Sequence, residues 1–317
     1  MDYYIGVDLG GTNIDVGIVD ENYKLVGSGA VPTNCPREAV EMVDDIVTLV
    51  FHLMNTYQIQ KQQIISMGIG VPGSVNKEMG IIGYANNLNF TGVPFLSLIK
   101  EKIEWPVYLD NDGNVGAWGE FLAGSGRGHH SMVMVTLGTG IGGGIIINDQ
   151  LFYGCNNSAG EIGHMVIEKN GLPCNCGRRG CFENYASATA LIKYAREAML
   201  ANRDSMLWEI CQKDTNKLNG VSFFEAVKKE DRVAKAVLEQ YISYLATGIA
   251  NLINIFQPDL LCISGGISQA GSLLLDPLKA LVEKEVYTRQ DKSGQTVLKV
   301  AKLVSDAGMI GAALLKN

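Results

Sequence analysis

The sequence lacks long hydrophobic runs, a basic amino terminus and any long basic block. No apolar stretch approaches the roughly eighteen residues with which a helix crosses a bilayer, and no basic region precedes an apolar segment at the amino terminus. These absences predict a cytoplasmic protein with no membrane partner. The net charge of -7 disfavours nucleic acid as the main partner, although an acidic protein can still bind phosphate locally.

Cysteine and proline are scarce, whereas glycine is abundant. The seven cysteines, an odd number, do not form the framework of a small secreted disulfide protein, and only 8 of the 317 residues are proline. By contrast, there are 37 glycines, and 47% of the residues are hydrophobic. The length and composition predict a folded α/β protein of about two domains.

One histidine and three cysteines are clustered between Gly160 and Glu183. The four residues are His164, Cys174, Cys176 and Cys181. They form the Cys3His ligand set of structural zinc sites, which leave no open position for a reactive water. The alternatives are buried thiols or a disulfide with a spare cysteine. Buried thiols are disfavoured because the cluster lies among glycines and arginines, whereas Cys262 lies in an apolar run, and disulfides need an oxidising compartment.

Two glycine turns lie inside strand patterns and resemble each other, which suggests an internal duplication. The first, at Gly10 and Gly11, joins two apolar segments into a hairpin, and the second lies within residues 137–144. Glycines let backbone N–H groups approach phosphate oxygens, whereas the plain alternative is a tight hairpin without a ligand. The adjacent Asp8 and the hydroxyl groups at both turns favour phosphate binding, and no P-loop motif is present.

Polar residues gather at two further places. Asp110, Asn111 and Asp112 follow an apolar strand and precede helical spacing, so they lie at a strand-to-helix junction. Helix capping accounts for any one of them but does not require all three. A second cluster, residues 86–89, contains three asparagines that either cap turns or bind hydroxyl groups.

Helices are expected outside these motifs. Residues 231–257 form a long, largely apolar helical stretch that ends before Pro258, and residues 306–315 read as a helix that packs back on the first domain. Ser222 with Glu225 has the pattern of a capping box.

Six motifs together resemble the ROK group of sugar kinases, within the actin-like ATPase superfamily. They are DLGGT at residues 8–12, LDNDGN at 109–114, LGTGIGGG at 137–144, GEIGH at 160–164, CNCGRRGCFE at 174–183 and SGGIS at 264–268. Within the group, the chain is most similar to bacterial ATP-dependent glucokinases. The resemblance implies an α/β, two-domain actin-like ATPase (ribonuclease H-like) fold with a duplicated mixed sheet core. The small domain would comprise residues 1–115 with 305–317, and the larger domain, which carries the zinc site, residues 116–304.

The resemblance also implies roles for individual residues. Asp112 would be the general base that takes the proton of a hexose 6-hydroxyl, with glucose as the expected hexose, and Asp8 would help to hold Mg2+ with ATP. The sugar-binding residues would be Gly73, Asn87, Asn111, Asp112, Glu161, His164 and Glu183. The nucleotide-binding residues would be Asp8, Gly10, Gly11, Thr12, Asn13, Gly138, Thr139, Gly140, Gly265 and Gly266, with the last two beside the adenosine.

The zinc would then have a local purpose. A metal bond to one ring nitrogen of His164 would fix the tautomer and the orientation of the ring, so that its other nitrogen faces a sugar hydroxyl. Asn13 departs from the family pattern, because many members carry lysine there.

Other functions stay open on the sequence alone. The motifs also fit kinases of N-acetylmannosamine, N-acetylglucosamine, allose or fructose, and a non-catalytic sugar-sensing protein. Repressors of the group carry a helix-turn-helix domain ahead of the kinase-like part, and DLGGT at residue 8 leaves no room for one. The expected assembly is a homodimer or a dimer of dimers.

Overall fold

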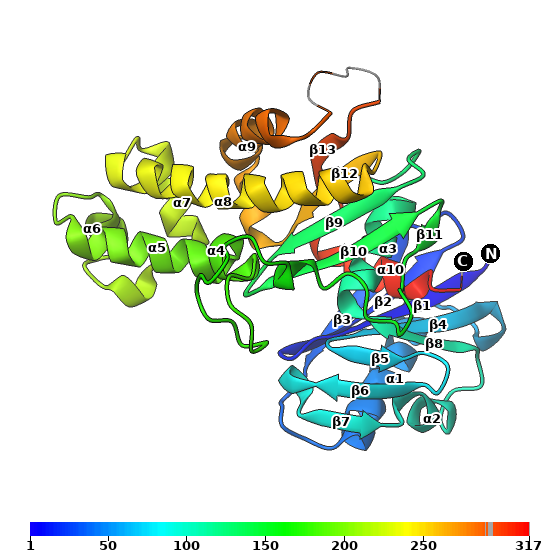
Figure 1. Ribbon diagram of the computed structural model, residues 1–317. Helices are drawn as coiled ribbons and strands as arrows, with labels where there is room; N and C mark the ends of the chain where they lie inside the picture. Colours follow the sequence, from blue (N-terminus) through cyan, green and yellow to red (C-terminus); the bar gives the residue numbers. More distant parts are fainter. Residues whose placement is uncertain (289, 291–293, 317) are drawn as a thin grey trace. The chain divides into compact units, whose positions relative to one another are not determined.

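The computed structural model describes residues 1–288, 290 and 294–316 (Figure 1). The chain divides into two compact units. Unit 1 comprises Met1–Met132, Gly144–Gly160 and Lys302–Asn317, and unit 2 comprises Val133–Gly143 and Glu161–Ala301. The domain boundaries expected at residues 115 and 304 remain predictions, and residues 289, 291–293 and 317 of those domains lie outside the described residues.

The first sheet belongs to unit 1 and has five strands in the order β3-β2-β1-β4-β8. Strands β1, β2 and β3 pair antiparallel, whereas β4 pairs parallel with both β1 and β8. The strands are β1 (Tyr3–Leu9), β2 (Asn13–Asp20), β3 (Leu25–Pro32), β4 (Ile64–Val71) and β8 (Val107–Asn111). The expected glycine hairpin is confirmed as the β1–β2 connection, in which Leu9 pairs with Ile14.

The two faces of this sheet pack against different helices. Because side chains alternate along a strand, Ile5 and Gly6 of β1 point to opposite faces. Ile5 is fully buried in one core with residues of α1 (Ala39–Thr56). On the other face, a Cβ at Gly6 would lie only 1.8 Å from the Met309 carbonyl oxygen of α10 (Ala307–Ala313), so glycine lets this helix lie directly on the strand. The carboxyl-terminal helix therefore packs on unit 1, as the sequence predicts.

The rest of unit 1 carries the polar motifs. A second, three-stranded antiparallel sheet consists of β5 (Ser74–Asn76), β6 (Ile81–Ala85) and β7 (Phe90–Val93), and α2 (Phe95–Lys100) follows it. Helix α3 (Asp112–Ala123) begins at the residue after β8. The expected strand-to-helix junction is thus confirmed, with no intervening loop.

A third sheet has the order β11-β10-β9-β12-β13. Its strands are β9 (Met132–Leu137), β10 (Ile141–Ile147), β11 (Gln150–Leu151), β12 (Leu260–Ser264) and β13 (Val297–Val300). In both five-stranded sheets, three consecutive strands lie side by side, β1 to β3 in one sheet and β9 to β11 in the other. Two later strands are then added next to the first of the three, which is β1 or β9. The repeated strand order confirms the expected duplication of a mixed sheet core.

The helices of unit 2 follow the zinc motif in the chain. They are α4 (Glu183–Ala186), α5 (Ala188–Ala201), α6 (Leu207–Ile210), α7 (Gly220–Lys228), α8 (Arg232–Phe256) and α9 (Ser272–Glu285). The long α8 confirms the helix expected before Pro258 and packs beside α5 (Figure 1). Among the described residues, no helix combines the length and the apolar character that a membrane span requires.

The expected capping box at Ser222 and Glu225 is wrong. Helix α7 begins earlier, and its N-cap is Asn219, whose side chain accepts from the Ser222 backbone N–H at 3.0 Å while the Ser222 hydroxyl accepts from the Asn219 N–H at 2.9 Å. Ser222 is therefore the third residue of the helix rather than its cap. Glu225 instead pairs with Lys229 one turn later, at 2.8 Å.

Candidate active site

The first glycine turn joins β1 to β2 and is held by backbone hydrogen bonds. The Gly10 N–H donates to the Asn13 carbonyl at 2.9 Å. From the other side, the hydroxyl of the buried Thr33 donates to the Gly10 carbonyl at 2.7 Å, and the Thr33 N–H donates to the Thr12 carbonyl at 2.8 Å. Thr33 lies outside the sequence motifs. Its partners Gly10 and Thr12 lie about twenty residues earlier in the chain, so no local pattern marks it as part of the turn.

The asparagine cluster lies beside this turn. Asn87 is exposed in a short 3-10 turn, Asn86–Leu88, which ends at Asn89 in the left-handed conformation with a φ of 57°. A Cβ at Gly11 would lie 3.0 Å from the Asn87 Cβ. Asn89 thus shapes the turn, whereas Asn87 is presented next to the glycine turn. Unit 1 brings together one residue expected to bind sugar and one expected to bind phosphate.

Asp112 is the first residue of α3, and Asn111 caps the helix. The Asn111 Oδ1 accepts from the backbone N–H groups of Gly113 (2.9 Å) and Asn114 (3.3 Å), which resolves the capping question in favour of Asn111. The Asn111 Nδ2 donates to the Gly73 carbonyl (2.9 Å) and to the Asp112 Oδ1 (3.0 Å). Gly73, Asn111 and Asp112 therefore form one hydrogen-bonded group.

Asp8 is half-buried near the end of β1, and its acidity is shifted. Burial, together with repulsion from the carboxylates of Asp112 and Asp15, raises its pKa from 3.8 to about 6. A Cβ at Gly308 would lie 2.1 Å from the Asp8 Oδ2, so glycine at the start of α10 makes room for this carboxylate. The carboxylates of Asp8 and Asp112 repel each other, and Asp8 lies next to the first glycine turn. Such a group of carboxylates has the character of a divalent cation site.

The second glycine turn joins β9 to β10 in unit 2 and is tied to the start of α5. The Gly138 N–H donates to the Gly140 carbonyl at 3.1 Å, and the Ala188 N–H donates to the Gly138 carbonyl at 2.9 Å. The Thr189 hydroxyl donates to the Thr139 carbonyl at 2.7 Å. Thr189 was not predicted as a site residue, since this contact joins residues 50 positions apart.

A cavity of about 410 Å³ opens beside this turn within unit 2. Its lining combines the turn, the metal-motif loop and α5, and includes Thr139, Gly140, Asn175, Glu183, Thr189 and Lys193. Lys193 of α5 is the one basic side chain of this lining and lies ten residues after Glu183, at which the cysteine motif ends. Neither Thr189 nor Lys193 carries a sequence signal of its own.

Gly265 and Gly266 follow the buried strand β12. Gly265 has a φ of 87°, and a Cβ there would lie 2.3 Å from the Leu137 carbonyl oxygen, so only glycine fits. A Cβ at Gly266 would meet no atom within 4 Å, which leaves open space at this residue. Unit 2 thus brings the end of β9 and the end of β12 together, as expected for two parts of a nucleotide site.

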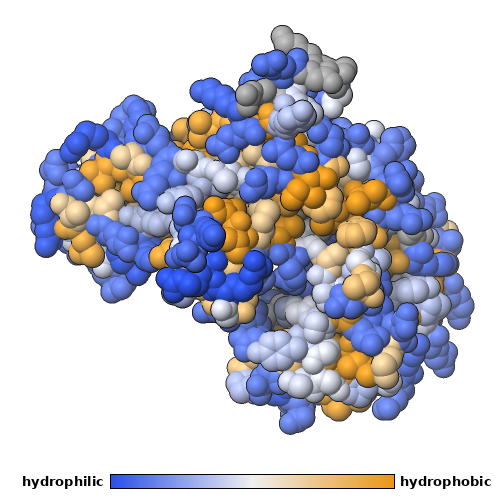
Figure 2. Space-filling view, viewed as in Figure 1, coloured by the Kyte–Doolittle hydropathy of each residue, from blue (hydrophilic) through white to orange (hydrophobic). Residues whose placement is uncertain are grey.

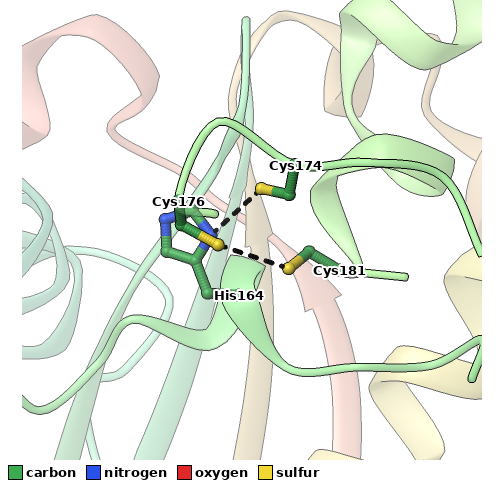
Figure 3. A group of neighbouring side chains, drawn as sticks. All are labelled: His164, Cys174, Cys176 and Cys181. Carbon is green, nitrogen blue, oxygen red and sulfur yellow. Dashed lines mark hydrogen bonds between the residues drawn. The ribbon is translucent and has the colours of Figure 1, made fainter. Parts of the chain in front are cut away.

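The Cys3His residues converge in unit 2 (Figure 3). Their ligand atoms all lie within 4.8 Å of one another. The His164 Nδ1 lies 3.6 Å from the Cys174 Sγ, and the sulfurs of Cys176 and Cys181 are also 3.6 Å apart. Metal bonds of about 2.0 to 2.3 Å in a tetrahedron give ligand separations of about 3.5 to 3.8 Å, so the two separations of 3.6 Å fit ligand pairs of one zinc ion. They are too long for a disulfide.

His164 is oriented as the metal hypothesis requires. Its Nδ1 faces the sulfurs, whereas its Nε2 lies 3.9 Å from the Glu161 carboxylate. Glu183 lies on the metal side, with its Oε1 3.2 Å from the Cys174 Sγ and 3.6 Å from the His164 Nδ1. A Cβ at Gly140 would lie 2.6 Å from the Glu183 Oε2. Glu183 therefore lies between the Cys3His group and the second glycine turn.

The loop that carries the cysteines has little core of its own. Residues 168–170 and 175–179 are exposed, and hydrophilic residues cover this part of the surface (Figure 2). Burial raises the pKa of the Cys174 thiol to about 12 and also raises that of Cys181, whereas a hydrogen bond from the Arg178 backbone N–H lowers the pKa of Cys176. Because metal ligands must be thiolates, a bound cation would stabilise the charged form and fix the loop.

Known proteins are similar to this chain in sequence and in fold. The profile of the ROK family matches residues 4–317. The glucokinase of Halalkalibacterium halodurans is 35% identical over 314 residues, which cover 99% of this chain and 94% of that protein. A crystal structure of a ROK family glucokinase from Streptomyces griseus in complex with glucose and AMPPNP is similar with a TM-score of 0.82 and 32% identity, covering 99% of this chain and 98% of that one.

Repressors are similar as well. A putative xylose repressor of Caldicellulosiruptor sp. is 30% identical over 308 residues, which cover 97% of this chain and 76% of the repressor.

Proposed function

Because the chain belongs to the ROK family and has its actin-like ATPase fold, we propose that it transfers the γ-phosphate of ATP to the 6-hydroxyl of glucose, with Asp112 as the general base. At the coarser level the chain is a hexose kinase, as the glucokinase relatives and the ROK structures support. The choice of glucose and the roles of individual residues are proposed.

The setting of Asp112 is the observation that carries the proposal. Its Oδ1 accepts from the Gly113 N–H at 2.8 Å and from the Asn111 Nδ2 at 3.0 Å, so the carboxylate is oriented at the start of α3. A carboxylate that takes the proton of the attacking hydroxyl needs such a fixed orientation, since phosphoryl transfer depends chiefly on positioning and charge neutralisation.

The phosphates and Mg2+ would be held by the two glycine turns and Asp8. In unit 1, Gly10, Gly11, Thr12 and Asn13 form the first turn, and in unit 2, Gly138, Thr139 and Gly140 form the second. A carboxylate oxygen suits Mg2+, and a bound cation would offset the burial and the carboxylate repulsion that raise the pKa of Asp8. When bound with ATP, Mg2+ supplies charge neutralisation on the phosphates.

The nucleoside would use the surfaces of unit 2 beside the second turn. Gly265 and Gly266 let a ligand approach the backbone after β12, and the cavity of about 410 Å³ lined by Thr189 and Lys193 adjoins Thr139. The volume of this cavity is within the usual range for small-molecule sites.

The sugar hydroxyls would be bound by Gly73, Asn87 and Asn111 of unit 1 and by Glu161, His164 and Glu183 of unit 2. We assign the Cys3His group to a structural zinc, because His164 Nδ1 faces the sulfurs and leaves Nε2 on the side of Glu161. A closed four-ligand shell gives the metal an orienting role rather than a chemical one.

The test is ADP release with ATP and Mg2+ over a panel of hexoses and N-acetylhexosamines at equal concentrations. Glucose is expected to give the highest kcat/KM. A preference for N-acetylmannosamine, N-acetylglucosamine, allose or fructose would contradict glucose as the substrate and leave the kinase class intact. Sugar binding without any phosphate transfer would favour a non-catalytic sugar sensor. A cytoplasmic location remains a prediction. The assembly as a homodimer or a dimer of dimers also remains a prediction, and light scattering on the purified protein tests it.

A further inference from the structure

Asp110 is a buried carboxylate that no role in phosphate transfer has yet explained. Its side chain is 2% exposed, and it lies in β8 two residues before Asp112. It accepts hydrogen bonds on both oxygens from four donors, which come from three separate parts of unit 1. Well-packed apolar side chains often stabilise a core as much as a buried ion pair does, so stability alone does not account for a buried charge of this kind.

One oxygen of Asp110 binds the start of α3. The Oδ1 accepts from the Asn111 backbone N–H at 2.7 Å and from the Asn114 Nδ2 at 3.2 Å. Asn111 is the N-cap that also donates to the Asp112 carboxylate, and Asn114 lies in the first turn of the helix. This oxygen therefore fixes the backbone and the first turn from which Asp112 projects.

The other oxygen binds two side chains that come from distant loops. The Oδ2 accepts from the Lys77 Nζ at 2.7 Å and from the Tyr153 hydroxyl at 2.9 Å. The Lys77 ammonium also lies 3.7 Å from the centre of the Tyr153 ring, so the two donors stabilise each other. Burial and the nearby Asp110 charge raise the pKa of Tyr153 above its ordinary value, and the hydroxyl accordingly stays a donor.

Both loops lead to residues expected to bind sugar. Lys77 follows β5, which begins at the residue after Gly73, and the Gly73 carbonyl accepts from Asn111. Tyr153 closes the loop that ends at Gly160, since its carbonyl accepts from the Ala159 N–H at 3.1 Å, and Glu161 is the next residue in the sequence. A carboxylate is rigid, so its two oxygens tie the position of these loops to that of the α3 cap.

We infer that Asp110, Lys77 and Tyr153 form a positioning group for the phosphoryl-transfer step, in which the Lys77 and Tyr153 loops hold the Asn111–Asp112 junction in its reactive geometry. The inference rests on the proposed role of Asp112 as the base. A displacement of a reacting group by about 1 Å can cost about a hundredfold in rate, so small shifts at this junction are expected to reduce kcat.

The test uses the full-length enzyme with the variants Lys77→Met, Tyr153→Phe and the double variant, because Asp110→Asn risks misfolding at a fully buried site. Each single variant is expected to lower kcat by about five- to thirtyfold, with the KM for ATP unchanged within about twofold, because one charge-assisted hydrogen bond is lost near the junction and none at the glycine turns. The double variant should lose less than the product of the single losses, since both donors share the Asp110 Oδ2. Lys77→Arg should restore kcat to within about threefold of the wild type, because a guanidinium can donate to the same oxygen.

Matched controls separate positioning from general destabilisation. Lys102→Met removes a Lys–Asp ion pair of unit 1 with Asp44, and Tyr3→Phe removes an exposed hydroxyl, both outside the group. Both controls should keep the wild-type kcat. If Lys77→Met and Tyr153→Phe lower the melting temperature but keep kcat within twofold, or if Lys77→Arg fails to rescue, the group is structural and the inference is wrong. The role of Asp112 as the base is tested separately, because retained turnover in Asp112→Asn would contradict that role.

Discussion

At the scale of single residues, Asp112 is held by hydrogen bonds from Asn111 and Gly113 that an asparagine side chain can keep. Asp112→Asn should therefore preserve hexose binding while lowering kcat by about a hundredfold to ten-thousandfold, the usual contribution of a general base. Steady-state kinetics and calorimetric titration of the hexose measure the two quantities. Asp15→Asn, which removes a neighbouring carboxylate from β2, is the matched control and should retain turnover. A similar kcat for Asp112→Asn and the control would exclude Asp112 as the base.

Asp8 predicts a pH dependence of stability. Its pKa of about 6 in the folded protein exceeds the ordinary value of 3.8, so the folded state binds the proton more tightly than the unfolded state. The stability that this proton contributes is fully present below about pH 3.8 and is lost as the pH rises through about 6. The difference of about two units between these pKa values corresponds to at most about 3 kcal/mol in the free energy of unfolding.

Asp8→Asn should remove this loss. Without divalent cations, the variant is expected to unfold at a higher temperature than the wild type at pH 8, whereas the gap between them should close towards pH 4. Thermal unfolding across this pH range is the measurement, with Asp20→Asn as a control at an exposed turn. Equal pH profiles for Asp8→Asn and the wild type would show that Asp8 does not carry the effect.

The residues that could be predicted from sequence are those in which the chemistry lies within a short motif. The Cys3His ligands and the Asn111–Asp112 pair are of this kind. Thr33, Thr189 and Tyr153 could not be predicted in the same way, because their partners lie 23, 50 and 43 positions away. A lone hydroxyl has no pattern in the sequence until the fold brings its acceptor close.

At the scale of elements, the loop that carries Cys174, Cys176 and Cys181 (the metal loop) contacts both Glu183 and His164 within unit 2. Glu183 lies 3.2 Å from the Cys174 Sγ and reaches under Gly140, and Asn184 donates to the Pro173 carbonyl at 2.9 Å. Loss of the metal should therefore disturb the second glycine turn as well as His164. From the sequence alone, the zinc was expected to orient only the sugar-binding side chain of His164.

Cys181→Ser tests the metal loop. Wild-type protein is expected to hold about one zinc per chain by elemental analysis, and Cys181→Ser should lose it while weakening hexose binding by about ten- to a hundredfold. The KM for ATP should also rise, because the Glu183 carboxylate next to Gly140 loses its support. Cys155→Ser, at an exposed cysteine outside the group, should keep both zinc and affinity. Active wild-type protein without zinc would contradict the assignment.

Elements were predictable where periodicity or glycine turns define them. The β1–β2 hairpin and α8 follow directly from apolar spacing, whereas the start of α7 was misplaced because Asn219 competes with Ser222 as a cap and the asparagine prevails. The packing of α10 on β1 depends on Gly6, whose role as a contact point is visible only once Met309 lies above it.

At the scale of the whole molecule, the two five-stranded sheets share one strand order, and the glycine turns that follow β1 and β9 are alike in sequence. The division of chemistry between the repeats could not be read from the pattern alone. The first turn has Asp8 beside it where the second has Thr136, whereas Glu183 at the end of the Cys3His motif lies beside the second turn.

Net charge is a whole-molecule property that bears on whether the chain binds DNA. The chain carries 26 lysine and arginine residues against 33 aspartate and glutamate residues, which gives a net charge of -7. DNA binding draws much of its affinity from cations that displace counterions along the phosphates, so a net negative charge disfavours it. This chain at about 10 µM should leave duplex DNA unretarded in a gel at about 0.1 M salt, with or without glucose. A sequence-specific shift that glucose relieves would instead assign it a regulatory function, and a basic DNA-binding protein of similar size serves as the positive control.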